Sequence, residues 1–175
     1  LITLFDLPVF LTIRDPRDCV ASLLSQFHYD FDFALHTIVS SAHETLALLE
    51  VCTPLILRYE ARGARSLQTL STIAKCLGVS AGRDRLREIH TRLSTRAVKQ
   101  FIGNLETSGV FDHRPPALQV HPATQWHPNH IGSGRVGKHA RELTPEQSAK
   151  VLYCTRAFSA RFGYLPTLPP IEPGV

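Results

Sequence analysis

One segment near the start of the chain limits the possible folds more than any other. Residues Leu7–Ile13 are mostly apolar and have the length of a strand, and Asp15 and Pro16 follow almost at once. Asp is a favourable N-cap and Pro suits the first turn of a helix. A buried strand that turns directly into a helix is typical of a parallel sheet in an α/β protein.

The alternation of strands and helices continues downstream. The spacing of apolar residues predicts helices over about 34–50, 66–77 and 83–105, the last a single long basic helix with a solvated arginine face, and a short strand over Leu55–Tyr59. Gly78 is expected to end the helix that precedes it. Because strands alternate with helices, the sequence predicts an α/β fold with a parallel sheet flanked by helices.

The C-terminal part of the sequence lacks this regular alternation at first and then predicts one more helix. From Glu106 to Arg141 the periodicity disappears, and we expect a long irregular segment there. Thr144, Pro145 and Gln147 then have the pattern of a capping box, which predicts one last helix that ends at Gly163. We therefore expect one domain over residues 1–165 and a Pro-rich extended tail over 166–175.

Composition excludes a disordered chain and a collagen-like chain. A chain of 175 residues with 43% hydrophobic and 19% charged residues fits one globular domain. The net charge of +4, without any block of five like charges, favours an anionic ligand such as a phosphate over a nucleic acid partner. No apolar run approaches the ~20 residues that span a bilayer, so we expect no membrane segment in this piece.

The cysteines point to a reducing compartment. Their positions form no Cys-x-x-Cys pair and no zinc-site spacing: Cys19, Cys52, Cys76 and Cys154. We expect free, buried thiols and a cytoplasmic location.

Arg14 and Ser22 are the strongest candidates for a binding site. A guanidinium at the carboxyl end of a strand can hold a phosphate through two parallel hydrogen bonds, and the following helix adds its positive N-terminal end and a hydroxyl. Ligands of open α/β sheets bind at these strand ends. The alternative is that Arg14 only pairs with Asp15 or Asp18 and that Ser22 has no functional role.

Four stretches resemble, in order, a known family. Arg14-Asp15-Pro16-Arg17-Asp18, with Ser22 eight positions after the first Arg, resembles the 3'-phosphate-binding segment of the sulfotransferases that use 3'-phosphoadenosine 5'-phosphosulfate (PAPS). The later stretches that look like those of the family are Leu57–Glu60, with the following helix that closes on Cys76–Val79, then Gly134–Gly137 ahead of Leu143–Gln147, and Phe162–Tyr164.

The resemblance implies a P-loop NTPase-like sulfotransferase fold and transfer of a sulfuryl group from PAPS to a hydroxyl or amine of a small-molecule or glycan acceptor. By position, Arg14 and Ser22 would hold the 3'-phosphate and Tyr59 would approach the adenine. Ser133, Gly134 and Arg135 would cradle a phosphate. PAPS or its product adenosine 3',5'-bisphosphate is the expected cofactor, no metal is expected, and a homodimer is an open question.

The chain departs from the family pattern at its start. The family's Gly-rich loop with its Lys and its usual catalytic His have no counterpart, since no His precedes Arg14. The chain also contains no Met and begins at Leu1. We therefore expect the catalytic residues upstream of Leu1, in a part that was removed or that belongs to a longer protein, and we expect the segment alone to be inactive.

A second departure concerns charge. The family's Arg-Lys pair and its Gly-Asp-Trp correspond here to Gly132-Ser133 and Gly137-Lys138-His139. Arg135 or Lys138 would then replace the lost charge. These changes favour the alternative function, a nonenzymatic binding or scaffold domain that retains the fold. A P-loop nucleotide kinase ranks last.

The irregular segment holds further candidates. His121, His127 and His130 lie close in sequence, but no Cys or acidic residue lies among them, so solvated or substrate-facing loop residues are favoured over a metal site. Trp126 is a candidate for an acceptor pocket, with local packing as the alternative. Cys19, near a helix N-terminus, is expected to pack inward rather than to have a lowered pKa.

Overall fold

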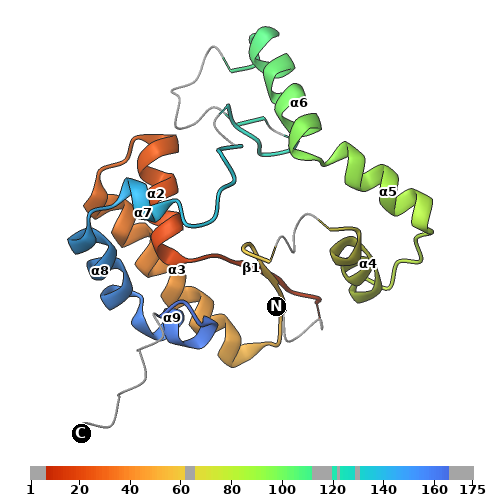
Figure 1. Cartoon of the computed structure of the whole chain (residues 1–175). Helices are drawn as coiled ribbons and strands as arrows, with labels where there is room; N and C mark the ends of the chain where they lie inside the picture. Colours follow the sequence, from red (N-terminus) through yellow and green to blue (C-terminus); the bar gives the residue numbers. More distant parts are fainter. Residues whose placement is uncertain (1–6, 62–65, 112–119, 122, 129–130, 166–175) are drawn as a thin grey trace, which may run out of the picture.

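The computed structural model describes residues 7–61, 66–111, 120–121, 123–128 and 131–165. These residues form a mixed α/β protein that is mostly helical, with one two-stranded sheet (Figure 1). Strand β1 (Phe10–Ile13) pairs in parallel with β2 (Leu55–Arg58), and Ile13 lies opposite Arg58. The α/β class and the parallel pairing are confirmed, although β1 begins three residues later than predicted and β2 ends one residue earlier.

Helices α2 (Pro16–Phe27) and α3 (Phe31–Val51) connect the two strands. As predicted, α2 begins directly after Asp15, whose carboxylate accepts a hydrogen bond from the Arg17 amide at 2.9 Å. Helix α3 begins earlier than predicted because Asp30 caps it and accepts from the Phe33 amide. A capping side chain thus sets the start of each helix.

The core lies where these helices meet the C-terminal helices α8 (Pro145–Cys154) and α9 (Arg156–Phe162). One cluster of buried residues joins α2, α3 and α8, and it comprises Val20, Ala34, Leu35 and Val151. A second cluster joins the end of β1 to α3 and α9, and it comprises Ile13, Ala42, Phe158, Phe162 and Tyr164. Together the clusters fix the end of β1 against the helices.

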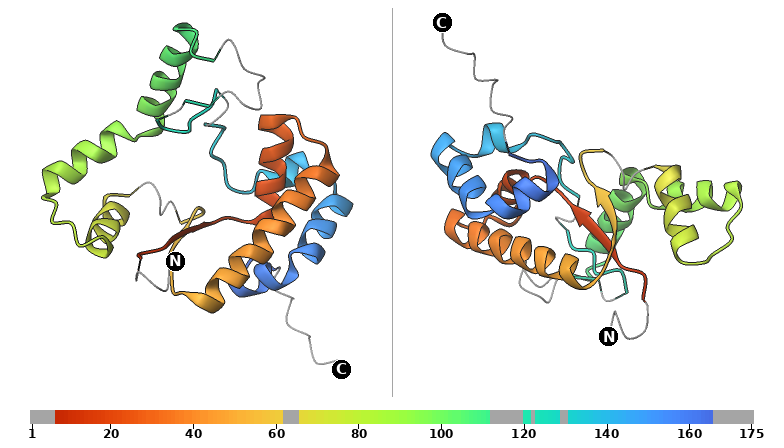
Figure 2. Two further views of the ribbon diagram at one scale, coloured as in Figure 1. Left: turned by 180° about the vertical axis from the view of Figure 1, so that it is seen from behind. Right: turned by 90° about the horizontal axis from the view of Figure 1, so that it is seen from below.

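Helices α4 (Leu67–Cys76), α5 (Arg83–Arg92) and α6 (Thr95–Thr107) lie on the other side of the strands from α2 and α3 (Figure 2). The predicted single helix over 83–105 is therefore wrong. The helix is interrupted at Leu93 and Ser94, because the Ser94 hydroxyl caps α6 by accepting from the Ala97 amide at 3.3 Å. The arginine face of these helices is exposed, as expected: Arg83, Arg85, Arg87, Arg92 and Arg96.

The capping box at Thr144 is confirmed. Its hydroxyl accepts from the Gln147 amide at 3.2 Å, and the Gln147 side chain accepts from the Thr144 amide at 3.0 Å. The single last helix is wrong, because α8 and α9 are separate helices that meet at Thr155. Helix α9 ends at Gly163, whose φ of 72° lies in the left-handed region.

Other predictions are corrected or lie beyond the described residues. The irregular segment predicted over 106–141 is shorter, because α6 reaches Thr107 and a short helix α7 (His139–Glu142) lies inside it. The four cysteines are free, but Cys76 is exposed and the other three are half-buried, so the prediction of buried thiols is wrong for Cys76 and holds only in part for the others. Residues 166–175, the predicted Pro-rich tail, lie outside the described residues.

None of the helices in the described part of the chain has both the length and the apolar character needed to cross a membrane.

Candidate anion-binding site

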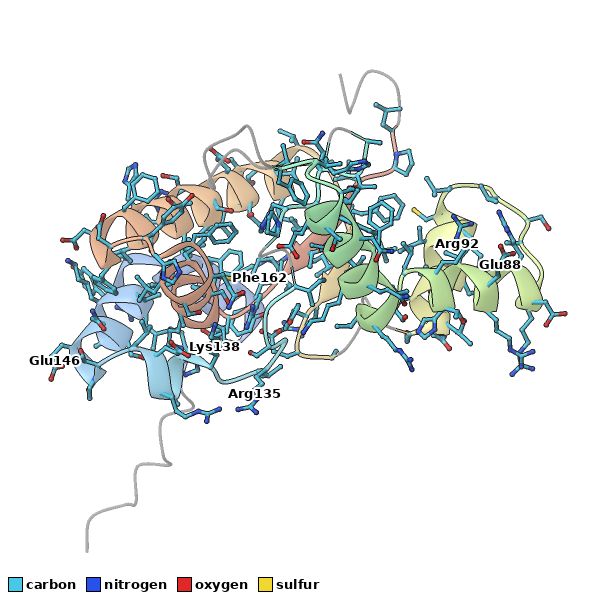
Figure 3. The ribbon with its side chains drawn as sticks, turned by 90° about the horizontal axis from the view of Figure 1, so that it is seen from above. Glu88, Arg92, Arg135, Lys138, Glu146 and Phe162 are labelled. Atoms are coloured by element: carbon cyan, nitrogen blue, oxygen red, sulfur yellow. The ribbon has the colours of Figure 1, made fainter. Side chains whose placement is uncertain are left out.

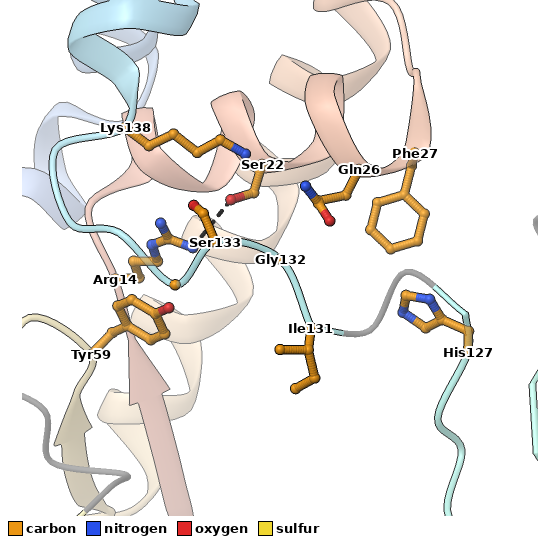
Figure 4. Close-up of a pocket in the computed structure, with 11 residues that line it drawn as sticks. Arg14, Ser22, Gln26, Phe27, Tyr59, His127, Ile131, Gly132, Ser133 and Lys138 are labelled. Atoms are coloured by element: carbon orange, nitrogen blue, oxygen red, sulfur yellow. Dashed lines mark hydrogen bonds between the residues drawn. The ribbon is translucent and has the colours of Figure 1, made fainter. Parts of the chain in front are cut away.

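A cavity of about 380 Å³ opens where the two strands end and α2 begins. Arg14 follows β1, and Tyr59 follows β2 with its amide donating to the Ile13 carbonyl oxygen at 2.9 Å. Figure 4 shows Arg14, Ser22 and Lys138 at one end of the cavity and Phe27 and His127 at the other. The remaining lining residues are Gln26, Tyr59, Ile131, Gly132, Ser133 and Gly134.

Arg14 is the most highly connected side chain of this cavity. Its Nη1 donates to the Ser22 hydroxyl at 3.1 Å, and its Nη2 donates to Asp18 at 3.3 Å and to the Arg135 carbonyl oxygen at 3.0 Å. The Tyr59 ring covers one face of the guanidinium, with 4.3 Å between the ring centroid and Cζ. The Nε atom is buried without a hydrogen-bond partner among the described residues. The guanidinium is therefore fixed in place beside the cavity.

Asp18 holds the segment around residues 135–139 against α2. It is fully buried, and its carboxylate accepts from the amides of Gly137 (2.8 Å) and His139 (2.9 Å) and from His139 Nδ1 (2.7 Å). Burial by itself raises the pKa of Asp18, but the hydrogen bonds from His139 and Gly137 and the charge of Arg14 outweigh it and lower the pKa below its ordinary value. Asp18 thus stays ionised, and it positions both Arg14 and the loop.

The loop before His139 supplies the wall opposite α2. Ser133 and Gly134 line the cavity, and the Ser133 hydroxyl accepts from the Arg135 amide at 3.4 Å. Gly134 has a φ of 64°, a backbone conformation that residues with a Cβ rarely adopt. A Cβ on Gly132 would lie 3.0 Å from the Gln26 side chain, so the loop approaches α2 closely at this point.

A polar layer behind the cavity fixes the end of β1. The Asp15 amide donates to Glu60 Oε1 at 2.8 Å, and the Tyr164 hydroxyl donates to Glu60 Oε2 at 3.0 Å. The Arg17 guanidinium donates two further hydrogen bonds to the Asp15 carboxylate, at 3.0 and 2.6 Å. Burial and the neighbouring Glu60 raise the pKa of Tyr164, so its hydroxyl keeps its proton and remains a donor.

Cys19 is not an activated thiol. Burial raises the pKa of Cys19 to about 12, although the residue as a whole is only half-buried. The positive charge of Arg14 acts in the opposite direction but is the smaller effect. The expectation that Cys19 packs inward, without a lowered pKa, agrees with this environment.

The structure separates three of the four candidates in the irregular segment. His127 lines the cavity and its ring packs on Phe27, with centroids 4.9 Å apart. His121 and Trp126 instead pack edge-on against Phe101 of α6, at 5.7 and 5.5 Å. Trp126 is therefore a packing residue and not part of the cavity wall.

The predicted histidine cluster cannot be assessed as a whole, because His130 lies outside the described residues. Within the described ranges, no three His, Cys, Asp or Glu side chains are grouped so that they could hold a metal ion.

Five of the six predicted binding residues line one cavity: Arg14, Ser22, Tyr59, Ser133 and Gly134. The sixth, Arg135, contributes its carbonyl oxygen to Arg14, while its side chain lines neighbouring cavities. Sequence reasoning missed Gln26 and Phe27, one and two positions beyond the turn that holds Ser22 and Ser25. It also missed the role of Asp18 in holding the loop, although Asp18 is part of the Arg-Asp-Pro-Arg-Asp motif.

Comparison with known proteins adds no family to this picture. No protein-family model, no curated protein and no solved structure matches the chain.

Proposed function

We propose that this chain is the 3'-phosphate-binding part of a PAPS-dependent sulfotransferase, an enzyme that transfers a sulfuryl group from PAPS to a hydroxyl or amine acceptor. One observation carries the proposal: Arg14 and Ser22 are hydrogen-bonded to each other and line one cavity with Tyr59, Ser133 and Gly134. Arg14, Ser22, Tyr59 and Gly134 come from three stretches that resemble the family in order, and Ser133 precedes the third. The same proposal includes a P-loop-like fold, a catalytic base, and an acceptor that bears the hydroxyl or amine.

The chemistry of this end of the cavity suits a phosphate. The Arg14 guanidinium supplies charge and the second N–H of Nη1, because both N–H groups of Nη2 are held by Asp18 and Arg135. Ser22 and Ser133 supply hydroxyls that can donate to phosphate oxygens. Asp18 and the Arg135 carbonyl oxygen hold Nη2 of Arg14, which keeps the guanidinium in one orientation before a ligand arrives. A fixed donor loses little conformational freedom on binding.

The remainder of the cavity suits the organic part of a nucleotide. The volume of the whole cavity, about 380 Å³, lies at the lower end of the range for small-molecule sites. Tyr59 offers a ring beside Arg14, and Phe27, His127 and Ile131 cover the far end. A ligand with a phosphate at one end and a planar group beyond it matches this division.

Calorimetric titration with adenosine 3',5'-bisphosphate tests the proposal, with adenosine 5'-monophosphate as the comparison ligand that lacks the 3'-phosphate. We expect the bisphosphate to bind more tightly. Arg14→Ala should weaken its binding about 10- to 100-fold, since a hydrogen bond to a charged group contributes about 1.5–3 kcal/mol. Ser22→Ala should weaken it less.

The matched control is Arg156→Ala, which removes an exposed arginine on α9, away from the cavity. Circular dichroism of each variant checks that the fold is retained. Equal affinity for the two nucleotides, or an Arg14→Ala variant that binds as wild type does, would contradict the proposal.

A second candidate is a nonenzymatic scaffold domain, which one observation favours. The Nη atoms of Arg14 already bind Ser22, Asp18 and Arg135, so the residue also fits a purely structural role. In that case wild type would bind neither nucleotide, and Arg14→Ala would lower the free energy of unfolding without any change in ligand binding.

A further inference from the structure

Lys138 is a buried cation without a counter-charge among the described residues. The residue is only 9% exposed, and its ammonium group donates a hydrogen bond to the Ser25 hydroxyl. No carboxylate within the described ranges lies close enough to form an ion pair with it. Burying a charge is costly unless the charge is paired. The environment of Lys138 therefore lacks an anion.

Lys138 also lines a second cavity, of about 330 Å³. This cavity shares Gln26, Ser133 and Lys138 with the first cavity but not Arg14 or Ser22. Its other lining residues are Ser25, Arg135, Arg141 and Glu142. Three cationic side chains thus face one carboxylate across this space.

The two arginines of this cavity are exposed, and neither guanidinium has an interaction partner among the described residues. Figure 3 shows Arg135 and Lys138 on the segment beside α2, far from the ion pairs of Arg92 and Glu88 on α5. The positive charge at this cavity is therefore not neutralised by neighbouring acidic residues other than Glu142.

The helix spacing separates this cavity from the first site by a fixed step. Ser22 and Ser25 lie three residues apart on α2 and so share a face of the helix, about 4.5 Å apart along its axis. Each hydroxyl is hydrogen-bonded to one cation, Ser22 to Arg14 and Ser25 to Lys138. The helix thus presents two cation–hydroxyl pairs about one turn apart. Arg14 and Ser22 line the first cavity, Ser25 lines the second, and Lys138 lines both.

We propose that Lys138, with Arg135 and Arg141 at the rim, forms a second oxyanion subsite that takes a phosphate or sulfate group beside the Arg14–Ser22 site. Ser25 is a positioning residue, because its hydroxyl donates to the Ala21 carbonyl oxygen at 2.9 Å and accepts from Lys138. Lysine offers three donors as a compact charge, and the arginines offer planar forks that match tetrahedral oxyanions. The occupant is either a second anionic group of a ligand held at Arg14 or a free anion. The inference does not rest on the proposed function, because its residues and its probe are different.

Equilibrium dialysis of the 175-residue chain against labelled orthophosphate at low ionic strength tests the stoichiometry. We expect two orthophosphate ions per chain for wild type and one for either Arg14→Ala or Lys138→Gln. A wild-type chain that binds one ion, which either substitution abolishes, would mean a single shared site and would overturn the proposal. A wild-type chain that binds none would also overturn it.

Arg141→Gln keeps the test decisive if Lys138→Gln fails to fold, since Arg141 is exposed and lines only the second cavity among those described. It should weaken the second ion about two- to five-fold, the range of an exposed charge pair, and leave the first unchanged. Arg161→Gln, an exposed arginine on α9, is the matched control and should change neither. An Arg141→Gln variant with both affinities unchanged would contradict the rim assignment.

Pyrophosphate distinguishes the two sources of the anion. If one ligand spans both subsites, a single pyrophosphate should bind at least about ten-fold more tightly than orthophosphate, and both Arg14→Ala and Lys138→Gln should weaken it. If the second anion is free, pyrophosphate should show no such gain. Orthophosphate bound at Lys138 in a chain that does not bind adenosine 3',5'-bisphosphate would sink the proposed function and leave this subsite intact.

Discussion

Replacing Asp18 by Asn removes one negative charge from the most buried junction of the candidate site and changes little in shape. The wild-type carboxylate accepts four hydrogen bonds, from the amides of Gly137 and His139, from His139 Nδ1 and from Arg14 Nη2. The Asn amide group would turn an N–H toward donors that need an acceptor. Arg14 would also lose its only carboxylate partner among the described residues.

The expected loss of unfolding free energy is about 3 kcal/mol. Breaking a buried ion pair by removal of one partner costs about 3–5 kcal/mol, and one charged hydrogen bond contributes about 1.5–3 kcal/mol. The Asn oxygen retains part of the hydrogen bonding, which places the expectation at the lower end of the first range. For a chain of this length, a loss of about 3 kcal/mol corresponds to a fall in Tm of about 6–12 °C.

Urea unfolding of both proteins between pH 3 and pH 7 measures this effect and its pH dependence. The pKa of Asp18 is lowered in the folded protein, so its stabilisation is fully present above its unfolded value near 3.9 and is lost as pH falls through the lower folded value. Asn does not titrate. The difference between wild type and Asp18→Asn should therefore be largest at neutral pH and should shrink below about pH 4.

Asp32→Asn is the matched control, because that carboxylate is 81% exposed and lies 3.0 Å from Lys150. It should cost no more than about 1 kcal/mol, the upper range for an exposed ion pair. The reasoning fails if Asp18→Asn is as stable as Asp32→Asn, or if the difference from wild type is the same at pH 3 and pH 7.

Two further predictions concern local features. Thr144→Ala should lower the unfolding free energy by about 1 kcal/mol because it removes the hydroxyl of the capping box, whereas Thr144→Ser should change it little; urea unfolding of the three proteins decides. In the native protein at pH 8, a thiol reagent should modify exposed Cys76 rapidly and Cys19 only after unfolding, since burial raises the pKa of Cys19 to about 12 and leaves almost no thiolate. Mass spectrometry of peptides from the native and the unfolded protein measures both rates, and equal labelling of the two residues would refute this account of Cys19.

Protein contacts hold the residues of the candidate anion site in place without a ligand. Arg14 is oriented by Asp18, in the first turn of the following helix α2, and by the carbonyl oxygen of Arg135, which lies 121 residues away in the chain. The cavity residues from the loop, Ser133 and Gly134, are held by the same carboxylate through the neighbouring amides. A change at Asp18 should therefore affect stability and anion binding together.

Features that depend on a few neighbouring residues could be predicted from the sequence. The start of α2 at Asp15 and Pro16, the capping box at Thr144 and the end of α9 at Gly163 all follow from hydrogen bonds or backbone angles within one turn. The parallel pairing of the two strands also followed, because the intervening helical segments allow a crossover. The end of one helix and the start of the next at Ser94 were not predicted. The apolar spacing continues through this position, and a serine within such a pattern can lie inside a helix or cap a new one.

The sequence by itself thus determined the local elements, and it placed Arg14 at the end of a strand and Ser22 on the helix that follows. Only the tertiary structure decided that the segment around Gly137 and His139 lies against Asp18, that His127 and not Trp126 reaches the cavity, and that Lys138 is buried beside Ser25. These contacts join residues more than one hundred positions apart. Their free energy depends on how α2, α3 and α8 pack as a whole, and no pattern within a short stretch of sequence contains that information.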